Sequence, residues 1–244
     1  MRRILVGAHR GAMCYAPENT LAAFEKAIAQ GAYRVEFDVR RCASGEIVVM
    51  HDATVDRTTN GTGRVADLTL AQLKGLKVGG SEPIPTLAET LALARGRCRL
   101  LVEVKDEGIT DDVVAEIARM GMLGACTLSS FSEATLLRAK AISPALATAY
   151  FHLQPGPFDP VAVVERLGVS LLVVWPKAAV PDQIAAAKGV GLHVRCGLPD
   201  TLTYEETWAE FRRLAAMGVD EVACGRPDWI ARMAEEYLHW NESR

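Results

Sequence analysis

Short runs of β-branched and apolar residues alternate along this chain with longer segments of helical period. The strand-like runs recur at about residues 6, 36, 102, 128, 148, 173, 194 and 222. Repeated βα units predict a parallel sheet. Eight such units in 244 residues favour a closed (β/α)8 barrel over an open sheet, because one barrel takes about 250 residues. We therefore expect an α/β protein with one domain spanning residues 1–244.

An additional hairpin interrupts the alternation after the second expected strand. Strands are expected over residues 33–39 and 46–50, with a turn between them. A long polar segment, residues 52–85, follows the hairpin and is expected to be a small insertion. Its Gly61-Thr62-Gly63 run is interpreted as a flexible turn, because no lysine and helix follow in the order of a phosphate-binding loop.

Capping residues mark the expected starts of several helices. Apolar residues on one face predict a helix over residues 19–30, with Asn19 as its N-cap. Three further starts carry a Thr followed three residues later by Gln or Glu, the pattern of a capping box. These pairs are Thr69 with Gln72, Thr86 with Glu89, and Thr203 with Glu206.

The charge balance argues against nucleic acid as a partner. Lys and Arg total 27 and Asp and Glu total 30, so the net charge at pH 7 is −3. A chain so close to neutral has no generic electrostatic attraction to a polyanion. Half of the residues are apolar and 23% are charged, a composition typical of a globular protein.

The apolar runs are short throughout the chain. None reaches the roughly 18 residues that a transmembrane helix needs, so no stable membrane insertion is expected. Residues 4–8 are too few for the apolar region of a signal peptide, which predicts a cytoplasmic protein. The six cysteines form no CxxC pair, so their spacing does not indicate a zinc site. Their even number would allow three disulfides, but without an export signal free thiols are expected.

Charged residues and histidines follow the first strands of the expected barrel. The carboxyl ends of barrel strands meet at one mouth, where active sites lie. Charged groups would be costly there without partners, and clustering at one mouth supplies those partners. The residues at these strand ends are His9, Arg10, Glu36, Asp38, His51, Asp52, Glu103 and Lys105.

Three of these residues are carboxylates suited to a metal ion. Glu36 and Asp38 are two positions apart, so both point to the same side of their strand. Together with Glu103 they predict an all-oxygen site for one divalent cation, Mg²⁺ or Ca²⁺. The alternative is that they form ordinary salt bridges with Lys105 and nearby arginines.

Two histidines at strand ends suit acid–base chemistry. His9 and His51 can each take or give a proton near neutral pH. Cleavage of a phosphodiester needs one group to assist the incoming oxygen and another to protonate the leaving alkoxide. Arg10 and Lys105, with the metal, would place positive charge on the phosphate oxygens. The remaining histidines are interpreted as structural; these are His152, His193 and His239.

These residues belong to an ordered series of short motifs. The series is Ala8-His9-Arg10-Gly11, Pro17-Glu18-Asn19-Thr20, Glu36-Phe37-Asp38-Val39, His51-Asp52, Asp56-Arg57-Thr58-Thr59-Asn60-Gly61-Thr62-Gly63, Pro85-Thr86-Leu87 and Glu103-Val104-Lys105. Shorter matches continue nearly to the C-terminus, at Ser129-Ser130-Phe131, Gly218-Val219-Asp220 and Arg226-Pro227-Asp228. In this series the chain resembles the glycerophosphodiester phosphodiesterase family.

The resemblance implies a TIM barrel with a small insertion. It also implies an enzyme that splits a glycerophosphodiester, a small-molecule substrate, into sn-glycerol 3-phosphate and an alcohol. In this enzyme Glu36, Asp38 and Glu103 would hold the metal, His9 and His51 would be the acid–base pair, and Arg10 and Lys105 would lie near the phosphate. Glu18 is expected among the substrate-binding residues, where it and Asn19 would orient the site; for Asn19 the alternative is the helix-cap role alone.

The chain departs from the family pattern at two places near the barrel mouth. Arg195 and Cys196 stand where the family commonly carries a Trp-Thr pair, and Cys224-Gly225 replaces a Thr-Asp pair. We hypothesise that Arg195 and Trp175 reshape the substrate pocket, with Arg195 binding a second anionic or polyhydroxylated group. The alternative is that Arg195 pairs with a carboxylate such as Asp200.

Other functions remain open at this point. The substrate could instead be a sugar phosphodiester or a lysophospholipid, the latter entering past apolar residues such as Met13, Tyr15 and Phe151. A non-catalytic barrel that binds a phosphate ligand is a further alternative, although binding alone needs no acid–base pair. The sequence distinguishes neither attack by water from attack by a substrate hydroxyl, nor one oligomeric state from another.

Overall fold

A computed structural model describes the backbone over residues 3–242 and the side chains through His239. Nine strands form one sheet in the order β1-β9-β8-β7-β6-β5-β4-β2-β3, and a further β1–β2 pairing closes it. Eight strands run parallel, and β3 pairs antiparallel with β2 outside the closed ring. The strands are β1 (Leu5–Ala8), β2 (Arg34–Arg41), β3 (Ile47–Val49), β4 (Arg99–Val104), β5 (Cys126–Ser129), β6 (Ala147–His152), β7 (Leu171–Val174), β8 (His193–Gly197) and β9 (Glu221–Cys224).

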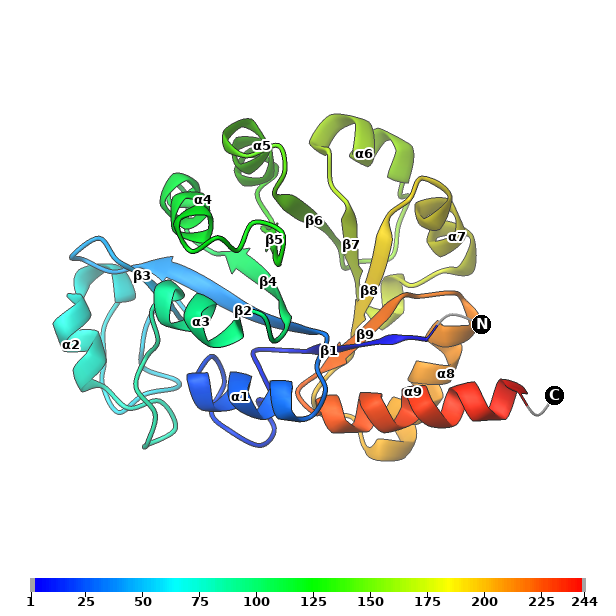
Figure 1. Ribbon diagram of the computed structural model, residues 1–244, viewed down its shortest axis with the longest axis horizontal. Coiled ribbons are helices and arrows are strands. Elements are labelled where there is room, and N and C mark those ends of the chain that lie inside the picture. The colour runs from blue at the N-terminus through cyan, green and yellow to red at the C-terminus, as the bar shows by residue number, and fades with distance from the viewer. Residues whose placement is uncertain (1–2, 243–244) are drawn as a thin grey trace.

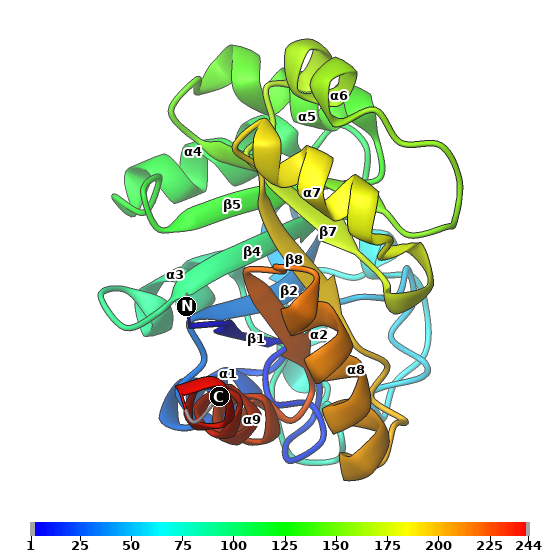
Figure 2. The ribbon, with the colours of Figure 1, turned by 90° about the vertical axis from the view of Figure 1, so that its right-hand side faces the viewer.

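Helices surround the strands, so the fold is the expected (β/α)8 barrel (Figures 1 and 2). The α-helices are α1 (Leu21–Ala29), α2 (Leu70–Gly75), α3 (Leu87–Ala94), α4 (Thr110–Arg119), α5 (Glu133–Ile142), α6 (Pro160–Leu167), α7 (Pro181–Gly189), α8 (Tyr204–Ala216) and α9 (Pro227–Glu242). Two short 3-10 turns are η1 (Val65–Asp67) and η2 (Pro176–Ala178). No helix within residues 3–242 is long and apolar enough to cross a bilayer.

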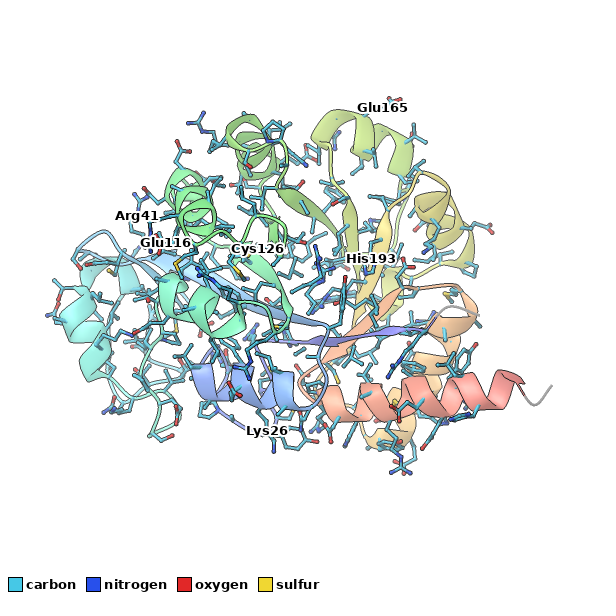
Figure 3. All side chains as sticks on the ribbon, in the orientation of Figure 1. Lys26, Arg41, Glu116, Cys126, Glu165 and His193 are labelled. Atoms are coloured by element: carbon cyan, nitrogen blue, oxygen red, sulfur yellow. The ribbon has the colours of Figure 1, made fainter. Side chains whose placement is uncertain are left out.

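Each outer helix buries an apolar face against the strands. In α4, Val113, Val114 and Ile117 are buried, because their spacing places them on one side of the helix. Exposed charged residues such as Lys26 and Glu165 point outward, whereas the Cys126 thiol lies between the strands and the helices (Figure 3). All six cysteines are free thiols in the described part of the chain.

The capping residues confirm three predicted helix starts and correct a fourth. The side chains of Thr69, Thr86 and Thr203 each accept from the backbone N–H three residues on, which completes the predicted boxes. The prediction of Asn19 as the cap of α1 is wrong, because Thr20 caps that helix. Asn19 instead adopts a left-handed backbone with φ of 58° and directs its side chain into the barrel mouth.

The insertion has an apolar core of its own beside the β2–β3 hairpin. In Figure 1, α2 lies next to the end of this hairpin, away from the barrel axis. Buried residues from the hairpin and the segment after it form this separate cluster; they are Cys42, Val48, Met50, Val55, Val65, Leu73, Val78 and Ile84. A different small cluster, including Leu101, Ala149 and Leu171, fills the inside of the barrel.

Candidate active site

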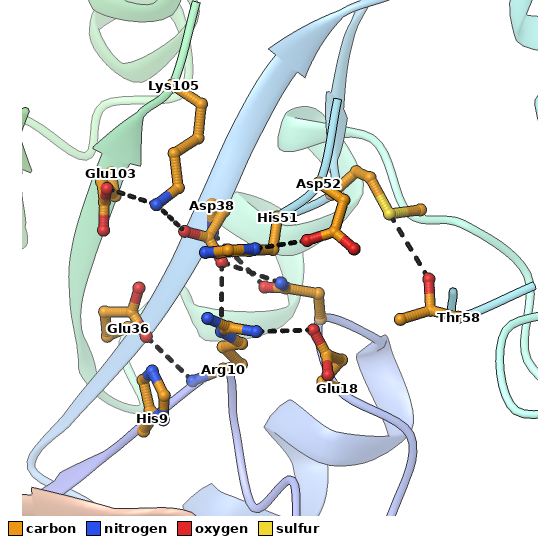
Figure 4. A network of polar contacts seen from close by, with 12 residues as sticks. His9, Arg10, Glu18, Glu36, Asp38, His51, Asp52, Thr58, Glu103 and Lys105 are labelled. Carbon is orange, nitrogen blue, oxygen red and sulfur yellow. Dashed lines mark hydrogen bonds and ion pairs between the residues drawn. The ribbon is translucent and has the colours of Figure 1, made fainter. Parts of the chain in front are cut away.

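The predicted residues converge at one mouth of the barrel (Figure 4), although β2 continues past Glu36 and Asp38 to Arg41 and enters the hairpin. Asp38 and Glu103 are register partners on adjacent parallel strands, which places their side chains side by side. His51 follows β3, so the hairpin brings it to the same mouth. One pocket of about 850 Å³ is lined by the predicted residues His9, Arg10, Glu36, Asp38, His51, Glu103, Lys105, Trp175 and Arg195.

Three carboxylates form a compact cluster at the centre of this site. Glu36, Asp38 and Glu103 each offer an oxygen within 4.8 Å of the others, and all three side chains are buried. The side-chain amide of Asn19 donates to Oδ2 of Asp38 at 2.9 Å. Nζ of Lys105 lies 3.0 Å from Oδ1 of Asp38 and also contacts Glu103. The cluster is therefore held in place before any ligand binds.

The electrostatics of the cluster fit a divalent cation. Burial and the neighbouring Asp38 charge raise the pKa of Glu103 to about 7, despite the nearby Lys105. Burial and Asp38 also raise the pKa of Glu36 above its ordinary value. These shifts reflect like charges crowded together, a situation that a bound cation relieves. Three hard oxygen donors are the ligand type that Mg²⁺ and Ca²⁺ prefer.

His9 is oriented by a carboxylate from the loop after β8, two strands away from β1 around the barrel. Its Nδ1 donates to Oδ2 of Asp200 at 2.7 Å, and the Gly225 backbone N–H donates to the other oxygen of Asp200. Burial lowers the pKa of His9, but the hydrogen bond to Asp200 and the charge of Glu36 outweigh it, so the pKa is raised. This arrangement leaves Nε2 of His9 as the nitrogen available for proton transfer.

His51 is held in an equivalent way by its neighbour in the chain. Its Nδ1 donates to Oδ1 of Asp52 at 2.6 Å. Its backbone carbonyl accepts from Nε and Nη2 of Arg40 at 2.9 and 2.8 Å. Both histidines therefore have a carboxylate on Nδ1 and line the pocket, as an acid–base pair requires.

Arg10 lies beside the carboxylates in a constrained conformation. Its φ is 49°, and its backbone N–H donates to Oε2 of Glu36 at 2.9 Å. Its Nη1 donates to Oε1 of Glu18 at 2.8 Å. Glu18, expected among the substrate-binding residues, thus lies behind Arg10 rather than on the pocket wall.

The other half of the pocket is mainly apolar and comes from the ends of β5 to β8. Trp175 and Phe131 are large exposed side chains here, with 47% and 65% of their surface accessible. The ring of Phe131 stacks on that of Phe151, with the ring centroids 4.5 Å apart. Leu153 and Leu198 complete this wall. The mouth is therefore divided into a charged half and an apolar half.

Arg195 lies deep in the barrel and is engaged by protein groups. Its guanidinium pairs with Glu221 and donates to the carbonyl of Ala8 at 3.2 Å. A Cβ at Gly7 would lie 2.5 Å from Nη1 of Arg195, so this close approach needs glycine. The alternative, that Arg195 pairs with a carboxylate, is confirmed, although the partner is Glu221 and the suggested Asp200 binds His9 instead. We attribute a structural role to Arg195, because its side chain is 3% exposed.

The sequence did not indicate the contacts that two residues of the site make, Asp200 with His9 and Arg57 with Asp52 and Glu18. Asp200 lies 191 positions from His9 in the chain, so no local pattern connects them. Arg57 from the insertion bridges Asp52 and Glu18. A charged residue shortly after the end of β8 was the available signal for Asp200, whereas Arg57 was visible only as part of a motif.

A closed barrel that places clustered carboxylates, two cations and two carboxylate-backed histidines at its mouth is built for phosphate-ester chemistry. The fold and site define a phosphoric diester hydrolase. The sequence profile of the glycerophosphoryl diester phosphodiesterase family matches residues 9–229. This chain therefore belongs to the glycerophosphoryl diester phosphodiesterase family.

Individual relatives match this chain in sequence or structure over nearly its full length. A glycerophosphodiester phosphodiesterase of Caldanaerobacter subterraneus subsp. tengcongensis is 31% identical over 247 residues, which cover 96% of this chain and 99% of the relative. A crystal structure of the Agrobacterium tumefaciens enzyme of that name superposes with a TM-score of 0.81 at 31% identity, covering 95% and 100% of the two chains. An Oleispira antarctica phosphodiesterase in complex with the product sn-glycerol-3-phosphate superposes with a TM-score of 0.84 at 28% identity. The match covers 96% of this chain and 97% of that one.

Proposed function

We propose that this protein hydrolyses glycerophosphodiesters to sn-glycerol 3-phosphate and an alcohol, using a divalent cation and an acid–base pair of histidines. One observation carries the proposal: three buried carboxylates and two carboxylate-backed histidines open into the same pocket. The product complex of the Oleispira antarctica phosphodiesterase, a structural neighbour, supports the choice of product.

Glu36, Asp38 and Glu103 would hold the cation. Mg²⁺ and Ca²⁺ both suit this all-oxygen set. When bound, a divalent cation supplies Lewis-acid polarisation of a phosphoryl oxygen and offsets the charge of the transition state. Asn19 and Lys105 keep the Asp38 carboxylate in position from two sides.

The side chains around the cluster supply the remaining functions. Of His9 and His51, one accepts the proton of the attacking hydroxyl and the other gives a proton to the leaving alkoxide. The attacking group is either water or the 2-hydroxyl of the glycerol moiety, and the second route passes through a cyclic phosphate. Arg10 and Lys105 place positive charge beside the non-bridging oxygens, where negative charge develops.

The test is turnover by metal-stripped protein with and without added Mg²⁺ or Ca²⁺. Substrates are glycerophosphocholine, glycerophosphoethanolamine and a sugar phosphodiester, and the readout is released phosphomonoester. Metal-dependent release from the glycerol substrates, lost in His9→Ala, is the expected result. Turnover of the sugar substrate alone would replace the proposed substrate class. Substrate binding without turnover of any of them would identify a binding protein instead.

Rapid-quench ³¹P NMR separates the two routes of attack. A transient cyclic phosphate indicates attack by the glycerol 2-hydroxyl. Direct incorporation of ¹⁸O from solvent, with no cyclic species, indicates attack by water.

A further inference from the structure

Arg57, from the insertion, makes two paired contacts at the rim of the barrel mouth. Its Nε donates to Oδ2 of Asp52 at 2.6 Å, and its Nη2 donates to Oδ1 at 3.1 Å. Its Nη1 and Nη2 each donate to an oxygen of Glu18 at 2.8 Å. The guanidinium is suited to such two-pronged pairing, which fixes direction as well as distance.

Both carboxylates that Arg57 binds are themselves partners of active-site side chains. Oδ1 of Asp52 accepts from Nδ1 of His51, and Oε1 of Glu18 accepts from Nη1 of Arg10. A continuous chain of contacts therefore joins His51 to Arg10 through Arg57. Arg57 itself does not line the pocket, so any effect on the reaction must pass through its partners.

The two histidines differ in how firmly their carboxylates are held. Asp200, behind His9, also accepts from the Gly225 backbone N–H just after β9, which belongs to the barrel frame. Asp52, behind His51, follows a hairpin strand outside the closed ring and has Arg57 as its other side-chain partner. The carboxylate behind His51 is therefore held by a side chain, Arg57, whereas the carboxylate behind His9 is held by the barrel backbone.

We propose that Arg57 is a positioning residue that fixes the His51 ring relative to Arg10, so that the insertion completes the active site. The proposal rests on the proposed function for its kinetic test. The pairing with Arg57 also lowers the pKa of Asp52 well below its ordinary range, which keeps it an acceptor for the His51 Nδ1–H. Nε2 of His51 then faces the substrate in one defined tautomer.

Arg57→Ala is compared with Arg64→Ala, which removes an exposed arginine of the same insertion. In the metal-loaded enzyme we expect kcat to fall about 10- to 100-fold in Arg57→Ala, with KM within threefold of the parent. Millimolar guanidinium should restore part of the lost kcat in this variant and leave the parent and Arg64→Ala unchanged. The Arg57 side chain is 49% exposed, so the melting temperature should change little.

A kcat within twofold of the parent, or a loss that guanidinium does not restore, would overturn the proposal. ¹⁵N NMR of the His51 ring gives a second readout that needs no substrate. The parent should show the Nδ1–H tautomer, and Arg57→Ala a mixture of tautomers. If the parent shows no turnover while this NMR difference is present, the proposed function fails and the role of Arg57 stands.

A separate observation concerns the apolar half of the pocket. Nζ of Lys177 lies 5.7 Å from the ring centroid of Trp175, and Nζ of Lys105 lies 5.9 Å from that of Phe131. These two exposed aromatic faces therefore already have an ammonium group beside them. Among the described residues that line this half, Asp200 is the acidic one, and it is bound to His9.

A phosphodiester centred on the carboxylate cluster has to place its two substituents on different sides. The hydroxyls of a glycerol moiety need polar partners, which the charged half provides. The second substituent then lies over the rings and Leu198. An ammonium headgroup there would meet like charge and no free carboxylate, whereas an uncharged group would bury apolar surface.

We infer that the alcohol moiety best accepted by this enzyme is uncharged and apolar rather than a choline or ethanolamine headgroup. This inference deepens the proposed function and rests on it. The probes are glycerophosphocholine and its 3,3-dimethylbutyl ester analogue, which has the same shape without the positive charge. The parent should show the higher kcat/KM for the uncharged analogue.

Lys177→Gln should raise kcat/KM for the choline substrate about threefold, the effect of removing one like charge some 6 Å away in water, and leave the analogue unchanged. Lys77→Gln, an exposed lysine of the insertion, is the matched control and should alter neither value. A parent that prefers choline, or a Lys177→Gln effect equal on both substrates, would overturn the inference. Absence of turnover on both substrates would instead count against the proposed function.

Discussion

The Nδ1 atom of His9 lies 2.7 Å from Oδ2 of Asp200, although 191 positions separate the two residues in the chain. The contact joins the end of β1 to the loop after β8, past the end of the intervening strand β9. A histidine at the end of a strand becomes a defined proton carrier only when its second ring nitrogen is fixed in this way.

Asp200→Asn should lower the pKa of His9 relative to the parent. The carboxylate stabilises the imidazolium form and holds the pKa of His9 above its ordinary value, so its neutralisation favours the uncharged ring. We expect kcat to fall about 10- to 100-fold in the same variant. NMR titration of His9 and steady-state kinetics check the two effects; an unchanged His9 titration would contradict this account.

Cation binding should weaken as the pH falls below 7. The pKa of Glu103 is about 7 because of burial and the Asp38 charge, so below that pH a proton competes with the cation for the carboxylate. Calorimetric titration with Mg²⁺ at pH 6 and pH 8 should show the tighter binding at pH 8, by up to about tenfold. Glu103→Gln should bind weakly at both pH values. Equal affinity of the parent at both would argue against Glu103 as a ligand.

Asn19→Gly should weaken cation binding with little loss of stability. Glycine adopts the φ of 58° that Asn19 has, so the backbone is kept, but the 2.9 Å hydrogen bond to Asp38 is lost. Removal of an outer partner of a metal ligand typically costs 10- to 100-fold in affinity. The same calorimetric assay measures the loss, and a thermal melt serves as the control. Affinity equal to that of the parent would assign Asn19 to the turn alone.

Glu221→Gln should destabilise the barrel by about 3 to 5 kcal/mol, because it leaves two buried guanidinium groups without their charge partner. Glu221 contacts Arg195 and also pairs with Arg34 at 3.0 Å, near the amino-terminal ends of the strands. Urea unfolding at pH 7 measures the difference. A change below about 0.5 kcal/mol would show that the cluster contributes little to stability.

The lowered pKa of the Glu221 carboxylate predicts that the protein loses stability in acid. Burial opposes the charged form, but Arg195 and Arg34 lower the pKa of Glu221 from 4.5 to about 2. The folded-state pKa is thus depressed, so the stabilisation is complete above pH 4.5 and is lost as the pH falls toward 2. The difference in unfolding free energy between the parent and Glu221→Gln should therefore narrow between pH 5 and pH 2.

Much of the barrel and its charged half could be predicted from the sequence, because the signals are local. Alternation of strand and helix patterns gives the order of elements. Residues such as Glu36 and Asp38, two apart on one strand, necessarily share a face. Active sites of such barrels lie at the carboxyl ends of the strands, so these residues are expected to meet there even when no long-range contact is known.

The parts that could not be predicted depend on contacts between distant segments. The partner of His9 is fixed by barrel closure, and the partner of Arg195 by its register with Glu221 on β9. Asn19 is of a residue type that often caps helices, but Thr20 caps α1 and the side chain of Asn19 instead donates to Asp38. In each case several partners of suitable chemistry exist, and only the three-dimensional arrangement selects among them.

The small apolar core of the insertion is separate from the cores inside and around the barrel. His51 lies where the hairpin leads into the insertion. The position of this histidine, unlike that of His9, therefore depends on the small core of the insertion. Units with few buried contacts open at lower free energy than the protein as a whole. On warming, the enzyme should therefore lose turnover while its barrel is still folded, and amides of the insertion should exchange with solvent before those of the parallel strands.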